Sequence, residues 1–255
     1  MALRRTITLL LAMLATLAGA EPSELSGTGV DAEQDQRRFT NTQRWDPVFL
    51  AFTRATPRHL PDDWGKRIII PAPPANSSPR TRAELAHLHE IRESRAEKRG
   101  EVRRELTSDG FQFGKHRYGI LLKSTERPAT RRMLDAMTPD LSLVIFSLKH
   151  RHDRIRPSVL DPGLGHLFPV PGHPAYPSGH STQAFTIAYL LEELDPARAE
   201  IYRKDALRIA RNREIAGFHY PSDTEAGRLA ARQFVDLLLA DPEFRLLLDA
   251  AKEEW

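Results

Sequence analysis

PSGHSTQAFTIAYLLEELDP, residues 177–196, is the stretch that decides the fold class. Its apolar side chains recur every third or fourth position, which is the period of a helix with one buried face. Ser178 is a residue type that caps helix N-termini, and Asp195-Pro196 marks the helix end. His180 shares the apolar face with Ala184, Ile187, Ala188 and Leu191. We therefore expect a helix over residues 178–194 that directs a histidine toward the core.

The segments that follow repeat this helical pattern. The next helix is expected to begin at Asp195-Pro196, and it places Arg213 on an apolar face, where an unpaired charge would be costly. Gly217 is a plausible C-cap, and residues 222–225 form a capping box that opens another helix. A short final helix is expected from Pro242 to about residue 252.

The earlier part of the chain adds two further helical patterns. One opens at Ser78-Pro79 and runs to about Leu106. The other is expected to begin at Asp140, after Pro139 has ended a preceding helix, and to carry Lys149 at its C-terminal end. Because no alternating strand pattern occurs, the fold class is predicted to be all-α, a multi-helix bundle with long loops and an N-terminal Pro-rich extended arm.

The N-terminus has the composition of a secretory signal peptide. Arg4 and Arg5 precede an apolar run over residues 6–17, and Ala18-Gly19-Ala20 forms a cleavage site. The run is shorter than the roughly 20 residues that a membrane span needs, although an uncleaved anchor is the alternative. We expect cleavage after Ala20 and a periplasmic or secreted protein without stable membrane insertion.

Three parts of the chain are therefore expected. Residues 1–20 are the signal peptide, residues 21–78 are a flexible leader followed by the Pro-rich arm, and residues 79–255 are the helical domain. The chain has 255 residues, a net charge of +3 and no cysteine. This composition excludes disulfides and thiol catalysis, and the charge is too small to indicate a nucleic-acid partner. The oligomeric state stays open, a homo-oligomer included.

Three short motifs in the second half supply the groups that a tetrahedral oxyanion needs. They are K-x6-R-P from Lys149 to Pro157, P-S-G-H at 177–180 and R-x5-H-x3-D from Arg213 to Asp223. Lys149 supplies a point charge, whereas Arg156 and Arg213 supply planar forks that match two oxygens. Ser178 and Gly179 lie at a helix start, where free N–H groups attract an anion. Each residue also has a plainer role as a solvated cation or a helix cap.

A histidine and a carboxylate complete the candidate site. Asp223 lies four residues after His219, and a carboxylate bonded to one imidazole nitrogen leaves the other nitrogen nucleophilic. Asp223 could equally be a helix-capping acid. The remaining nearby histidines are expected to be loop residues or, at most, substrate contacts; they are His150, His152, His166 and His173. These histidines lack a carboxylate partner at a suitable spacing, so the sequence does not indicate a metal site.

Taken together, the motifs resemble the signature of the type 2 phosphatidic acid phosphatase (PAP2) superfamily, and its class A bacterial non-specific acid phosphatase branch in particular. The resemblance covers about residues 139–239. It implies an all-α core and a two-step hydrolysis of small phosphate monoesters that uses neither a metal nor another cofactor. By resemblance, His219 is the nucleophile that becomes a phosphohistidine, Asp223 orients it, and His180 is the acid and then the base.

The same resemblance assigns phosphate binding to Lys149, Arg156, Ser178, Gly179 and Arg213. One position departs from the pattern, because Asn212 stands where the family usually has Ser, and we expect an altered phosphate affinity. Three alternatives remain. One is a vanadium-dependent haloperoxidase, since vanadate mimics phosphate. The second is a lipid or pyrophosphate phosphatase of the cell envelope. The third is a catalytically inactive anion-binding protein.

Overall fold

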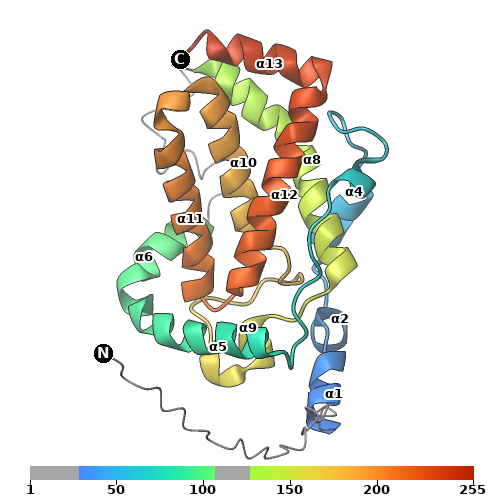
Figure 1. The fold of residues 1–255 in the computed structure, drawn as a ribbon, viewed down its shortest axis with the longest axis vertical. Helices are drawn as coiled ribbons and strands as arrows, with labels where there is room; N and C mark the ends of the chain where they lie inside the picture. The colour runs from blue at the N-terminus through green and yellow to red at the C-terminus, as the bar shows by residue number, and fades with distance from the viewer. Residues whose placement is uncertain (1–28, 107–126) are drawn as a thin grey trace, which may run out of the picture.

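The computed structural model describes residues 29–106 and 127–255. Within these ranges every regular element is a helix, and loops connect the helices (Figure 1). The all-α prediction is therefore confirmed. The helices are α1 (Gly29–Gln36), α2 (Phe39–Thr42), α3 (Pro47–Ala51), α4 (Trp64–Arg67), α5 (Pro79–Ile91), α6 (Arg95–Leu106), α8 (Pro128–His152), α9 (Pro157–Leu160), α10 (Gly179–Leu194), α11 (Ala199–Ile215), α12 (Pro221–Ala240) and α13 (Pro242–Lys252). The predicted signal peptide lies outside the described residues.

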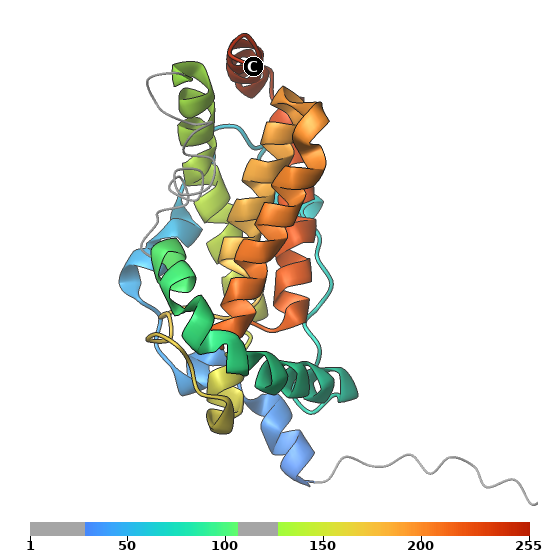
Figure 2. The same ribbon diagram turned by 90° about the vertical axis from the view of Figure 1, so that its left-hand side faces the viewer.

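A bundle of long helices forms the centre of the molecule. Helix α10 packs along both α11 and α12, α8 runs beside them, and α13 crosses the far end of the bundle (Figures 1 and 2). Large buried side chains from every one of these helices make one core, including Leu148, Leu190, Tyr202, Phe234 and Phe244. The helix expected over residues 178–194 is present as α10, with Ser178 as its N-cap.

Helix α8 is longer than the sequence suggests. It runs without interruption from Pro128 to His152, although Pro139 lies inside it. The prediction that Pro139 ends one helix and Asp140 begins another was therefore wrong. The carboxylate of Asp140 does not cap a helix; it accepts hydrogen bonds from the backbone amides of Arg58 and His59, at 2.9 and 2.7 Å. Asp140 thus fastens the Pro-rich arm to the bundle.

The helical pattern over residues 79–106 forms two helices instead of one. Helix α5 ends at Ile91, a 3-10 turn spans Arg92–Ser94, and α6 begins at Arg95. The two helices point in different directions (Figure 2), and α6 packs against α11. This bend brings the C-terminal end of α6 close to the end of α11, which carries Arg213.

Within its described part, the leader expected to be flexible over residues 21–45 forms the two short helices α1 and α2. Phe39 is fully buried, which gives α2 an apolar anchor that the polar composition of this segment conceals. The Pro-rich arm lies on the bundle as expected, with Ile68 and Ile70 buried in the core. Several of its residues form the short helices α3 and α4 instead of extended chain.

A glycine on α12 sets how closely this helix approaches the start of α10. A Cβ at Gly227 would lie 2.8 Å from the carbonyl oxygen of Ser178 and 2.8 Å from Cβ of Ser181. Any larger residue would separate the two helices. The contact fixes the P-S-G-H segment against the first turns of α12, which contain Asp223.

Candidate active site

The candidate site lies at the end of the bundle opposite α13. There the C-terminal end of α8, the N-terminus of α10 and the turn between α11 and α12 meet (Figure 1). The turn is tight because Gly217 adopts φ 79°, and a Cβ there would lie 2.6 Å from the carbonyl oxygen of Gly165. Gly217 was expected to end α11, and the turn it allows places His219 three residues before the helical Ser222.

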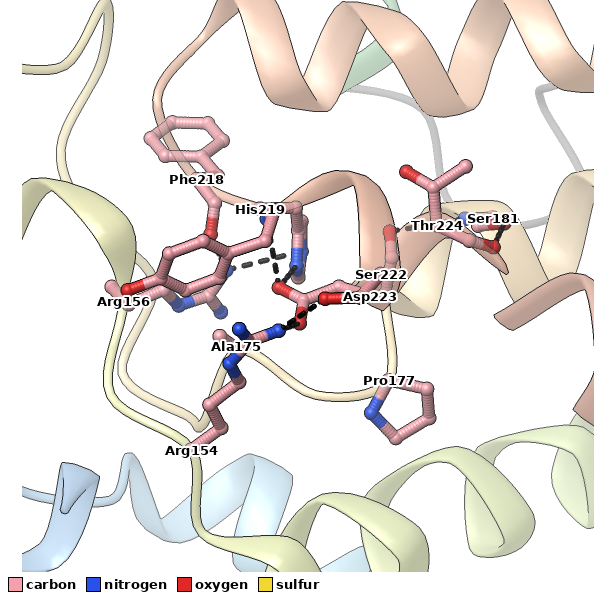
Figure 3. Close-up of polar contacts among 12 residues, drawn as sticks. Arg154, Arg156, Ala175, Pro177, Ser181, Phe218, His219, Ser222, Asp223 and Thr224 are labelled. Carbon is pink, nitrogen blue, oxygen red and sulfur yellow. Dashed lines mark hydrogen bonds and ion pairs between the residues drawn. The ribbon is translucent and has the colours of Figure 1, made fainter. Parts of the chain in front are cut away.

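His219 and Asp223 form a buried pair. Nδ1 of His219 lies 3.1 Å from Oδ2 of Asp223, and the same oxygen accepts from the backbone amide of Tyr220 at 3.0 Å (Figure 3). Because the carboxylate can only accept, Nδ1 carries the proton and Nε2 holds the lone pair. Burial, followed by the charges of Arg156 and Lys149, lowers the pKa of His219 well below its ordinary 6.5. The imidazole is therefore held neutral, with its lone pair on Nε2.

Arg156 connects the loop before α10 with the turn before α12. Its Nη1 donates to the carbonyl oxygen of Phe218 at 2.9 Å and lies 3.1 Å from Nε2 of His219 (Figure 3). Its Nη2 donates to the carbonyl oxygen of His173 at 2.9 Å. Among the described residues Arg156 forms no ion pair with a carboxylate, and burial lowers its pKa to about 10. It is a buried cation aimed at His219.

Lys149 is buried and held by three backbone carbonyl oxygens. Its Nζ donates to the carbonyls of Pro174, Ala175 and Pro177, at 2.8, 3.1 and 2.6 Å. Burial, and then the charge of Arg156, lowers the pKa of Lys149 well below 10.5. Its contacts hold the chain that leads into α10, so Lys149 fixes the helix N-terminus as well as supplying charge.

Ser178 and Gly179 form the N-terminus of α10 as the sequence predicts. Ser178 is fully buried, and its backbone amide donates to the carbonyl oxygen of Asp223 at 3.0 Å. Its Oγ accepts from the amide of Ser181 at 3.4 Å, which is the N-cap interaction. A Cβ at Gly179 would lie 3.6 Å from Cε of Lys149. The first turn of α10 therefore lies beside the lysine.

His180 and Arg213 stand on neighbouring helices, and the charge of Arg213 acts on His180. Burial, and then the charge of Arg213, lowers the pKa of His180 well below 6.5, with smaller effects from Lys149 and Arg156. Arg213 is fully buried, and burial lowers its pKa to about 10. His180 also lowers the pKa of His219. The structure thus brings all eight predicted site residues into one region.

Arg154 is a further residue of the site that the three motifs do not include, and it is only 3% exposed. Its Nη1 donates to Oδ1 of Asp223 at 2.6 Å and to Oγ of Ser222 at 2.8 Å, while Nη2 lies 3.3 Å from Glu84 (Figure 3). Its guanidinium carbon stacks 3.8 Å from the centre of the Tyr220 ring. The signal was its place within K-x6-R-P, two residues before Arg156. Asp223 therefore lies between His219 and a buried cation.

Asn212, the departure from the family pattern, is turned toward α6. Its amide nitrogen donates to the two carboxylate oxygens of Glu105, at 3.0 and 3.1 Å. Of the other histidines, His173 contacts the site, because Nη2 of Arg156 lies 2.9 Å from its Nδ1. Within the described ranges, no group of three or more acidic or histidine side chains could hold a metal ion. None of the described helices combines the length and hydrophobicity that crossing a bilayer requires.

Comparisons with known proteins agree with this picture. No family model matches the chain. The non-specific acid phosphatase of Providencia stuartii is 29% identical over 143 residues, which cover 54% of this chain and 58% of that protein. The acid phosphatase of Zymomonas mobilis is 32% identical over 80 residues, which cover 31% of this chain and 30% of that protein. The chain thus spans less than two thirds of either relative.

A solved structure shares the fold. The crystal structure of a bacterial vanadium-dependent iodoperoxidase matches 82% of this chain and 64% of its own, with a TM-score of 0.50 and 17% identity. At this identity the match speaks for the fold alone. The chain is thus similar in sequence to acid phosphatases over part of their length, it shares its all-α fold with the iodoperoxidase, and the three motifs that resemble the PAP2 signature meet at one end of the bundle.

Proposed function

We propose that the protein is an acid phosphatase that hydrolyses phosphate monoesters through a phosphohistidine, without a metal ion. The observation that carries the proposal is the arrangement at His219. Its Nδ1 is bound to Asp223, and its Nε2 faces Arg156, beside the buried Lys149 and Arg213. A neutral, oriented imidazole among buried cations suits attack on a phosphoryl group whose oxygens carry negative charge.

In the first step, Nε2 of His219 forms a bond to phosphorus as the bond from phosphorus to the ester oxygen breaks. His180 gives a proton to that departing oxygen, so an alcohol leaves. Arg156, now binding a phosphoryl oxygen, no longer donates to Nε2. Arg213 and the amides at the start of α10 bind the equatorial oxygens, where charge develops, and Lys149, whose three N–H groups are bonded to carbonyl oxygens, contributes its positive charge nearby. Asp223 stabilises the positive charge on the phosphorylated imidazole.

In the second step, a water molecule attacks phosphorus and the phosphorus–Nε2 bond breaks. His180 takes the proton from the water and thereby returns to its starting state, while inorganic phosphate leaves. The first step requires His180 to be protonated, yet burial and Arg213 lower its pKa. The negative charge of a bound phosphate ester opposes this effect, and an acidic medium supplies the proton. Activity should therefore be greatest at acidic pH.

The test is hydrolysis of p-nitrophenyl phosphate by the wild type and His219→Ala, each with and without EDTA. We expect His219→Ala to lower kcat by about 10³-fold or more, since removing a catalytic nucleophile has effects of this size or larger. EDTA should leave the wild type unchanged. His87→Ala serves as the matched control, because His87 is exposed on α5. Full activity of His219→Ala would overturn the proposal, and so would loss of the wild-type activity in EDTA.

The fold shared with the iodoperoxidase makes halide oxidation the second candidate. It is tested on the same preparations by adding vanadate, hydrogen peroxide and iodide. Under the leading proposal vanadate instead inhibits phosphatase activity, since it occupies the phosphoryl site. Iodide oxidation that depends on vanadate, in a protein that releases no p-nitrophenol, would favour the second candidate.

We also propose that the protein acts in the periplasm or is secreted, with cleavage after Ala20. The basic residues Arg4 and Arg5, the apolar run and the Ala18-Gly19-Ala20 site support this placement. N-terminal sequencing of the protein recovered from a periplasmic extract should begin at Glu21. Recovery of the full-length chain in the cytoplasm would contradict it.

A further inference from the structure

Glu105 contacts the candidate site although it belongs to none of the three motifs. It lies at the C-terminal end of α6 and is 7% exposed, so its carboxylate is almost completely removed from water. A buried carboxylate is costly unless cations and hydrogen-bond donors surround it. Glu105 has such partners, and all three belong to α11.

Three side chains of α11 donate to this carboxylate. Oε1 accepts from Nη1 of Arg208 at 2.7 Å and from Nδ2 of Asn212 at 3.0 Å. Oε2 accepts from Nη2 of Arg213 and from Nδ2 of Asn212 at 3.1 Å. Arg208 supplies a positive charge, and the amide nitrogen of Asn212 contacts both oxygens. The carboxylate is therefore held in one orientation.

The contact uses only one nitrogen of Arg213. Its Nε and Nη1 are buried and have no hydrogen-bond partner among the residues that the structure describes. A buried guanidinium with two unbonded nitrogens is costly, and an oxyanion would satisfy both. Glu105 therefore holds Arg213 from one side and leaves the other donors for a ligand.

The backbone of the same residue contacts the proposed acid. The carbonyl oxygen of Glu105 accepts a hydrogen bond from the ring of His180, which partly opposes the lowering of the histidine's pKa by burial and Arg213. This contact links His180 to the end of α6 that also holds Arg213. Residue 105 consequently contacts two of the eight predicted site residues, one through its side chain and one through its backbone.

We propose that Glu105 is a positioning residue of the phosphate site. Its carboxylate holds the guanidinium of Arg213 with Nε and Nη1 directed to the phosphoryl oxygens, and Asn212 serves the site by orienting Glu105. This inference rests on the proposed function, in that the oxyanion held by Arg213 is the phosphoryl group of a monoester. It also accounts for Asn212, whose longer side chain reaches α6 where a serine would not.

A competing account predicts the opposite change in phosphate affinity when Glu105 is removed. A carboxylate on Arg213 could act as a competitor that must leave before phosphate binds, and its removal would then tighten phosphate binding. The positioning role predicts weaker binding instead, because Arg213 loses the group that orients it. The direction of the change in phosphate affinity decides between the two.

The experiment compares Glu105→Ala, Glu105→Gln and the matched control Glu101→Ala in the full chain. Glu101 lies one turn earlier on α6 and pairs with Arg208, but it has no hydrogen bond or ion pair with Arg213 among the described residues. Calorimetry measures the Kd of inorganic phosphate, and p-nitrophenyl phosphate hydrolysis gives KM and kcat. Glu105→Ala should raise Kd and KM by about 10-fold, the scale of one hydrogen bond to a charged group.

Glu105→Gln should stay within about 3-fold of the wild type, because its amide oxygen still accepts from Arg213 while the charge is gone. Glu101→Ala should change neither Kd nor KM by more than about 2-fold, as is usual for a partly exposed ion pair. A merely structural role would lower the melting temperature without moving Kd. An unchanged or lower Kd in folded Glu105→Ala would overturn the inference.

Glu105→Asp covers the case in which Glu105→Ala fails to fold. It keeps the negative charge beside α11 but withdraws the carboxylate from Arg213, so Kd should rise as expected for Ala; wild-type binding by this variant would overturn the inference. The outcomes also separate from the proposed function. If the variants bind phosphate more weakly but the wild type does not hydrolyse the ester, only the proposed phosphatase activity is refuted. If the variants keep full turnover and wild-type phosphate binding, only the positioning role of Glu105 is refuted.

Discussion

At the scale of single residues, the site depends on a cation that touches no predicted phosphate ligand. Arg154 bonds Asp223 on one side and Glu84 on the other, and all three side chains are buried. Burial alone would lower the pKa of Arg154, but the charges of Asp223, Tyr220 and Glu84 raise it above its ordinary value. The arginine therefore stays charged and limits how Asp223 can be placed against His219.

Removal of this arginine should affect stability and activity together. Arg154→Ala leaves two buried carboxylates without their cation, and breaking a buried pair in this way costs about 3–5 kcal/mol. We expect the free energy of unfolding in urea to fall by this amount. We also expect kcat for p-nitrophenyl phosphate to fall by about 10-fold to 100-fold, because a misplaced orienting carboxylate has effects of at least this size.

Arg151→Ala is the matched control for this prediction. Arg151 lies three residues earlier and is exposed, and its guanidinium donates to the carbonyl oxygen of Gly65 at 3.2 Å. This variant should keep kcat and stability close to the wild type. An Arg154→Ala protein that matches it in both measurements would show that Asp223 is positioned by other contacts.

At the scale of helices, a buried acid joins α11 to α12. Glu214, near the end of α11, accepts a hydrogen bond from Oγ1 of Thr224 in the first turn of α12, and it is 5% exposed. Burial raises the pKa of Glu214 to about 7, although the bond from Thr224 acts in the opposite direction. The folded protein therefore keeps this proton at pH values where the unfolded chain has released it.

The sign of the resulting pH dependence follows. Because the folded state binds more protons between pH 4.5 and 7, the free energy of unfolding falls as the pH rises through that window. A difference of this size corresponds to about 3 kcal/mol. Glu214→Gln should remove this part of the slope, so the variant gains stability relative to the wild type between pH 4.5 and 7.5 in urea titrations.

Glu200→Gln provides the comparison on the same helix, because Glu200 is exposed and pairs with Lys204 across one turn. Glu200→Gln should leave the change in the free energy of unfolding between pH 4.5 and 7.5 as it is in the wild type. If Glu214→Gln shows the wild-type slope as well, the carboxyl of Glu214 is not the group responsible.

Local patterns predicted most of the helices, and they failed where a distant contact decides the outcome. Ser178, Asp195-Pro196 and Gly217 mark helix ends through their own backbone chemistry, and the structure has those ends. Pro139 should have ended a helix, yet α8 continues through it, with its buried face packed on the bundle. The neighbouring Asp140 binds amides more than 80 positions earlier in the chain.

The same distinction separates the predicted site residues from those that were missed. The eight predicted site residues belong to motifs with short, fixed spacings, so they can be recognised in the sequence. Glu105 cannot be recognised in this way, because its role depends on its contact with Arg213, 108 positions later. It also depends on the bend between α5 and α6, which no residue pattern predicts. Its surroundings in the sequence are charged residues of an apparently solvated helix.

At the scale of the whole molecule, ligand binding and folding should be linked, because α8, α10, α11 and α12 each contribute charged or capping groups to one site. Burial and mutual repulsion lower the pKa of Lys149 and of both histidines, and a phosphate anion among them relieves that repulsion. A ligand that binds only the folded state stabilises it by about 2.7 kcal/mol at 100 times its Kd. Inorganic phosphate should therefore raise the melting temperature in scanning calorimetry, whereas sodium chloride of equal ionic strength should not. Arg156→Met should lose this response and Arg151→Ala should keep it; an equal rise with chloride, or in Arg156→Met, would mean that the anion acts on the surface and not in the site.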